Sequence, residues 1–124
     1  MSWHKLTNSE LQACRKLLML DVAEAAELIG KVSNRTWQYW ESGRSQVPVD
    51  VDEEMYTAIQ RRNDLITKYT QWQMDNDGET LQMRYYHTFE QYEADHKKAS
   101  KLDWRIHQSA VAFVFSEGGE VELL

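Results

Sequence analysis

Hydrophobic and polar positions recur at helical spacing in three short segments before Pro48. The first segment follows Thr7, where Glu10 completes a capping box that satisfies two backbone donors. The second follows Asp21, again with an acid three residues later at Glu24, and the third follows Ser33. The pattern therefore predicts three capped helices joined by very short turns. Their apolar positions are Leu11, Cys14, Leu17, Leu18, Ala25, Leu28, Ile29, Trp37 and Trp40.

The pattern after Pro48, the single proline, predicts a second and mostly helical portion. Asp50 is expected to cap a long helix to about Met74. Residues 80–86 (TLQMRYY) alternate loosely and favour a strand, and a helix is expected from Thr88 to about Asp95. A last helix, capped by Asp103, runs to about Phe115, and the tail ends in a short strand. We expect a mainly α fold, with a helical bundle over residues 1–48 and a helical module with one or two strands over residues 49–124.

The composition is that of a folded globular protein. Of the 124 residues, 42% are hydrophobic and 27% charged, which is typical of a folded globular domain. No run of apolar residues approaches the length that crosses a membrane, and the N-terminal residues lack the layout of a signal peptide. We therefore expect a cytoplasmic protein in a reducing compartment. The single cysteine, Cys14, is expected to be a small buried apolar residue rather than a nucleophile.

The net charge of −6 is unevenly distributed along the chain. Residues 1–48 carry six Lys or Arg and five Asp or Glu, a net of +1, and the remainder carries eight basic and fifteen acidic residues, a net of −7. A slightly basic head on an acidic body suits a protein that presents one end to phosphate groups. The distribution is compatible with nucleic acid as a partner.

Residues 21–48 have the layout of a helix-turn-helix. Ala25 and Ala26 are small enough for two helices to approach closely, and Gly30 allows a turn where a side chain would clash. Trp37 and Trp40 are expected to anchor the third helix to the core. The opposite flank then carries amide, guanidinium and hydroxyl groups, which are the groups that reach base edges in a major groove. The candidate base-contacting residues are Asn34, Arg35, Gln38 and Tyr39.

Residues 10–48 resemble the Xre/Cro-type helix-turn-helix, with one extra turn residue at Lys31. The matching residues are Leu20, Asp21, Gly30, Val32, Ser33, Trp40, Glu41, Gly43 and Pro48. The chain is similar, over nearly its whole length, to the narrower YdiL-like family, which includes anti-CRISPR-associated repressors. This similarity lies in ELQACRKLLMLDVAEAAELIG, RTWQYWESGRSQVP and DWRIHQSAVA.

The resemblance implies a lambda-repressor-like head and a homodimeric autorepressor that binds an inverted repeat in double-stranded DNA. It places Asn34, Arg35, Gln38 and Tyr39 on the recognition helix. Phosphate contacts would come from Lys31, Ser33 and Arg44, and Glu41 would cap or brace the motif rather than touch DNA. Residues 49–124 would form the dimerisation module. RNA stays open as a further partner.

The aromatic residues of the second portion have two interpretations. They favour a core and a dimer interface, because aromatic side chains dominate both, over a ligand pocket that would make the protein a sensor. These residues are Tyr85, Tyr86, Phe89, Tyr92, Trp104, Phe113 and Phe115.

The sequence contains no pattern typical of an enzyme. Glu90, Glu93 and Asp95 lie among lysines and are expected to form a solvated face, and the four histidines are scattered. We find no Ser-His-Asp arrangement, phosphate loop or metal-ligand spacing, so we expect no enzyme, no cofactor and no metal. The alternative to a DNA-binding regulator is a protein-interaction adaptor or antitoxin-like partner that uses the helical head as a scaffold.

Overall fold

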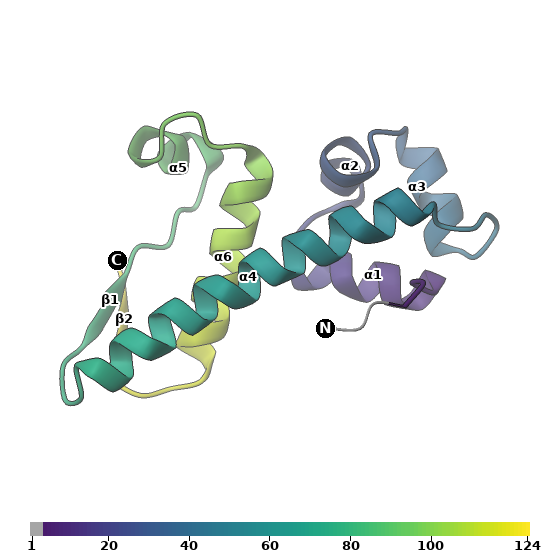
Figure 1. The fold of residues 1–124 in the computed structure, drawn as a ribbon. Coiled ribbons are helices and arrows are strands. Elements are labelled where there is room, and N and C mark those ends of the chain that lie inside the picture. The colour runs from purple at the N-terminus through teal and green to yellow at the C-terminus, as the bar shows by residue number, and fades with distance from the viewer. Residues whose placement is uncertain (1–3) are drawn as a thin grey trace. The chain divides into compact units, whose positions relative to one another are not determined.

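A computed structural model describes residues 4–124. Helices dominate this part of the chain, and its strands form one two-stranded parallel sheet, so the expected mainly α class is confirmed. The chain forms two compact units, Met1–Gln60 and Arg61–Leu124. One long helix contributes residues to both units (Figure 1).

The first unit contains α1 (Asn8–Leu17), α2 (Val22–Ala25), a π-helical turn η1 (Ala26–Gly30), α3 (Asn34–Glu41) and the start of α4 (Val49–Asp75). The three predicted helix starts are confirmed. Thr7 and Asp21 each accept a hydrogen bond from the backbone N–H three residues later, and the acid at that position accepts one in return. Ser33 caps α3 by accepting from the N–H of Thr36 at 3.2 Å. Each start depends on contacts within four residues, which explains why the sequence predicts it.

The turn between η1 and α3 differs from the prediction. The left-handed residue that ends the helix is Lys31, with φ of 55°, and not Gly30. The wider π-helical turn accommodates the extra residue, because the N–H groups of both Lys31 and Val32 donate to the carbonyl of Ala26. Gly30 is required for packing instead: a Cβ there would lie 3.0 Å from ring carbons of Trp37 and Trp40.

The first unit extends past Pro48, where the sequence suggests a boundary, to Gln60. The reason is that the first turns of α4 are part of its core, since Val51, Met55 and Ala58 are buried. The buried carboxylate of Asp52 accepts a hydrogen bond from the N–H of Leu6 and pairs with the Lys5 ammonium at 3.1 Å. These contacts attach the start of α4 to the N-terminal segment.

The second unit contains the remainder of α4, β1 (Leu81–Met83), α5 (Phe89–Asp95), α6 (Lys101–Ser116) and β2 (Val121–Leu123). The two strands are parallel, with Leu81 opposite Val121. The predicted start of α5 at Thr88 is confirmed. The predicted cap of α6 is wrong: Ser100 is the N-cap, and Asp103 is the third helical residue, whose carboxylate accepts from the Ser100 N–H.

Two apolar clusters form the core of the second unit. One contains Leu81, Met83, Val111 and Val114, with Tyr85 packed against it. The other contains Tyr86, Tyr92 and Trp104, with Phe89 against it. The core interpretation therefore holds for five of the predicted aromatic residues. Phe113 and Phe115 are 38% and 50% exposed and belong to neither cluster.

Candidate nucleic-acid interface

The two flanks of α3 have opposite chemistry. Trp37 is fully buried and Trp40 is 5% exposed, and their rings meet edge to face with centroids 5.5 Å apart. Asn34, Arg35 and Gln38 lie on the other flank and are all exposed. The structure thus brings three of the four predicted base-contacting residues onto one polar face. Tyr39 is half-buried at the edge of that face.

The N-terminal end of α3 combines features that attract an anion. Lys31 and Ser33 are exposed beside it. The backbone N–H groups of a first helical turn point out of the helix end, where the helix dipole favours negative charge. Because Lys31 adopts the left-handed conformation, the chain turns sharply into the Ser33 cap. A phosphate at this end would meet a cation, a hydroxyl and backbone donors together.

The C-terminal end of α3 carries Arg44. Gly43, with φ of 82°, turns the chain back, and the N–H of Ser45 donates to the carbonyl of Tyr39. The Arg44 guanidinium then lies over the Tyr39 ring, with its central carbon 4.4 Å from the ring centroid. Arg44 itself is exposed. The candidate phosphate-contacting residues therefore lie at both ends of the helix that carries the candidate base-contacting residues.

A buried ion pair fixes α3 against α1. The guanidinium of Arg15 donates to both carboxylate oxygens of Glu41, at 2.6 and 3.1 Å, and also to the carbonyl of Leu20. The indole N–H of Trp37 donates to Glu41 as well, at 2.5 Å. Burial opposes ionisation of Glu41, but the hydrogen bonds from Arg15 and Trp37 outweigh it and hold its pKa below the ordinary value of 4.5.

Glu41 has the bracing position that the sequence predicts for it, while sequence reasoning missed Arg15. Arg15 lies in the last turn of α1, 26 residues before Glu41 and next to the exposed Lys16. No local pattern distinguishes a buried arginine from a solvated one. What identifies Arg15 as a structural residue is its burial on one face of α1, and that burial arises only when the helices pack together.

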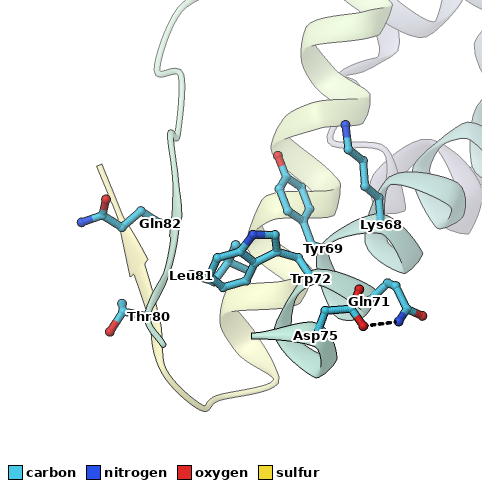
Figure 2. Close-up of a pocket in the computed structure, with 8 residues that line it drawn as sticks. All are labelled: Lys68, Tyr69, Gln71, Trp72, Asp75, Thr80, Leu81 and Gln82. Atoms are coloured by element: carbon cyan, nitrogen blue, oxygen red, sulfur yellow. Dashed lines mark hydrogen bonds between the residues drawn. The ribbon is translucent and has the colours of Figure 1, made fainter. Parts of the chain in front are cut away.

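The second unit contains a cavity of about 680 Å³ (Figure 2). Trp72 and Tyr69 of α4 and Leu81 of β1 form its apolar wall, and Gln71 donates to Asp75 at the rim. The volume is in the range of small-molecule pockets. None of the seven aromatic residues that the sequence suggests for a ligand pocket lines it.

Two of the histidines that are scattered in the sequence lie together in the second unit. His96 and His107 have ring centroids 6.2 Å apart, and both contact the rings of Tyr86 and Tyr92. Burial, together with the neighbouring His96, lowers the pKa of His107 to about 4. Within residues 4–124, no group of three His, Cys, Asp or Glu side chains is arranged to hold a metal ion.

Cys14 is half-buried, and burial raises the pKa of its thiol. None of the helices in the described part of the chain is both long enough and apolar enough to cross a membrane.

Comparisons with known proteins all point to one family. The family model described as Aca2/YdiL-like matches residues 6–123. The Aca2 repressor of Pectobacterium phage ZF40 is 48% identical over 113 residues, which cover 91% of this chain and 96% of that protein. The uncharacterized protein YdiL of Escherichia coli (strain K12) is 24% identical over 108 residues, or 86% of this chain and 91% of its own. The chain therefore belongs to the Aca2/YdiL-like family.

Proposed function

We propose that this protein is a sequence-specific, homodimeric repressor of transcription, and not an enzyme, that binds an inverted repeat in double-stranded DNA. The observation that carries the proposal is the exposed polar face of α3, held from behind by Trp37, Trp40 and the Arg15–Glu41 pair. The 48% identity to a protein named as a repressor supports the same role.

In this proposal the base edges in the major groove are contacted by Asn34, Arg35, Gln38 and Tyr39. Amide groups match adenine and the guanidinium matches guanine, each through two parallel hydrogen bonds. Lys31 and Ser33 at one end of α3, and Arg44 at the other, contact phosphates and fix the orientation of the helix.

A single α3 reads too few bases to specify a site. Its eight residues span about 12 Å, which is a fraction of one DNA turn. Proteins of the helix-turn-helix class solve this with two copies on half-sites about one turn apart. The second unit offers the apolar surface for pairing, since Trp72, Phe113 and Phe115 are exposed there.

The test starts from a random pool of duplexes, selected for binding by the full chain. We expect an enriched inverted repeat, a footprint over it, and a species of twice 14.7 kDa by light scattering. Binding should weaken steeply with salt, because phosphate contacts release counterions. Absence of any enriched sequence would overturn the DNA-binding role and favour a protein adaptor.

The surface used for pairing can be tested separately. Phe115→Glu places a charge on the exposed apolar surface of the second unit and should shift the light-scattering mass toward the monomer. Leu17→Glu is the matched control, because Leu17 is a similarly exposed apolar residue in the first unit. A dimer that survives Phe115→Glu and dissociates with Leu17→Glu would place the interface in the first unit.

A further inference from the structure

The contact between Tyr39 and Arg44 has a consequence for how each side chain meets DNA. The Arg44 guanidinium is 4.4 Å from the centroid of the Tyr39 ring, well within the range of a cation–π interaction. One face of the ring is therefore already covered in the free protein. The ring is also half-buried, so less of it is accessible than of Asn34, Arg35 or Gln38.

Resting on the proposed function, we propose that Tyr39 is a positioning residue that holds the Arg44 guanidinium ready for a DNA phosphate. It does this through its ring and not by reading a base. This role takes the place of the base contact that the sequence suggests for Tyr39. The base-reading set is then reduced to Asn34, Arg35 and Gln38.

The backbone supports this arrangement. The left-handed Gly43 reverses the chain directly after α3, and the Ser45 N–H donates to the Tyr39 carbonyl at 3.2 Å. Ser42 donates to the same carbonyl through its hydroxyl. The segment that carries Arg44 is thus tied to the residue whose ring Arg44 covers.

The charge of Arg44 remains available to an external anion. Within residues 4–124 no ion pair involves Arg44, whereas Arg15 donates to a carboxylate and a carbonyl. A ring satisfies a guanidinium face but leaves its N–H donors, which lie in the guanidinium plane, free for a phosphate. Stacking also orders a long side chain before binding, so less conformational entropy is lost when the phosphate contact forms.

The stack itself is tested first, in the DNA-free full chain by NMR. The Arg44 side-chain protons should be shifted upfield by the ring current of Tyr39. We expect Tyr39→Phe to keep this shift and Tyr39→Leu to abolish it. An unshifted Arg44 in the unsubstituted protein would overturn the proposal, whatever the protein does with DNA.

The role is tested on a duplex selected by the unsubstituted protein. Tyr39→Phe should bind within twofold and prefer the same bases, because the phenyl ring still stacks. Tyr39→Leu and Arg44→Ala should each weaken binding by about 2- to 5-fold for each half-site. In the Arg44→Ala background, Tyr39→Leu should cause no further loss, since the two residues act as one.

Two results would overturn the proposal while leaving the DNA-binding role intact. One is a change of base preference in Tyr39→Phe, which would indicate that the hydroxyl reads a base. The other is a further loss from Tyr39→Leu in the Arg44→Ala background. Should Tyr39→Leu melt below the assay temperature, Tyr39→Met keeps more of the side-chain volume and answers the same question. If no duplex is selected at all, the proposed function fails first.

Discussion

The two units differ in what they leave exposed. On the first unit, α3 presents Asn34, Arg35 and Gln38, with cationic residues at both of its ends. On the second, the exposed surface includes Trp72, Phe113 and Phe115, and in the described part of the chain all exposed Trp and Phe side chains belong to this unit. The first surface is suited to a polar, anionic partner, and the second to an apolar one.

The interiors of the two units also satisfy buried polar groups differently. The first unit buries a charged pair, Arg15 and Glu41, which fixes the orientation of α3. The second buries Arg62, which donates to the Ser109 hydroxyl at 2.7 Å, and Gln108, which donates to the Tyr86 carbonyl. A bidentate ion pair therefore holds α3 in place in the first unit, whereas neutral partners accept from the buried Arg62 and Gln108 in the second.

The largest expected effect is that Trp40→Ala unfolds the first unit. The side chain is 5% exposed and packs on Trp37, so its removal leaves a cavity that costs about 3–5 kcal/mol. Hydrogen exchange should accelerate across residues 8–47, and DNA binding should be lost. Protection of residues 81–123 should persist, because both of their clusters lie within the second unit. Equal loss of protection in both segments would show that the units unfold together.

Lowering the pH should destabilise the second unit and spare the first, which is the reverse of the effect of Trp40→Ala. The pKa of His107 is about 4 in the folded chain, below the ordinary value of 6.5. The unfolded chain therefore binds more protons than the folded chain between these values, so the second unit loses stability as pH falls from 6.5 to 4. Because solvent screens the exposed part of the ring, we expect the free energy of unfolding to fall by roughly 2 kcal/mol and not by the full equivalent of the pKa shift.

The first unit should resist this range of pH. Glu41 has a lowered pKa, so its contribution to stability is fully present above pH 4.5 and is lost only at lower pH. Unit-resolved melts at pH 7 and pH 5 measure the difference, and His107→Asn should remove the pH dependence of the second unit. Equal weakening of both units at pH 5 would contradict the assignment to His107.

Arg35→Ala should affect binding while leaving folding unchanged. A bidentate contact to guanine is worth roughly 1–3 kcal/mol, so affinity for the selected duplex should fall by about one to two orders of magnitude. The melting temperature should hardly move, because Arg35 is exposed. Lys97→Ala removes one exposed charge from the second unit and is the matched control. Gel shifts in which the two variants bind alike would contradict the placement of the reading surface on α3.

The smallest effect is expected from Met19→Gly. Met19 ends α1 in the left-handed conformation, with φ of 61°, and the N–H groups of Met19 and Leu20 bond back to Lys16 and Arg15. Glycine adopts this conformation without strain, so stability should rise by about 1 kcal/mol. Met19→Ala retains the strain and should gain nothing in a thermal melt. Lys98, with φ of 67°, is the corresponding position in the second unit.

Much of the fold follows from short-range patterns. The caps at Thr7, Asp21, Ser33 and Thr88 were predictable because each depends on a side chain and an N–H three residues away. The buried flank of α3 was predictable from the spacing of Trp37 and Trp40, and the family from motifs spread over the chain. The left-handed residue at Lys31 was not predictable, since glycine is the usual residue there and Gly30 is adjacent.

The sequence by itself predicted the mainly helical class, four of the helix starts, the exposed polar residues of α3 and the family. Only the tertiary structure decided which distant residues contact one another and hold these elements in place. The pairing of Arg15 with Glu41, of His96 with His107, and of β1 with β2 joins residues that are 26, 11 and 40 positions apart. The physical reason is that local hydrogen bonds and periodicity are encoded within a few residues. Burial depends on the approach of distant segments, so it turns a solvated arginine into a structural one and a scattered pair of histidines into a cluster.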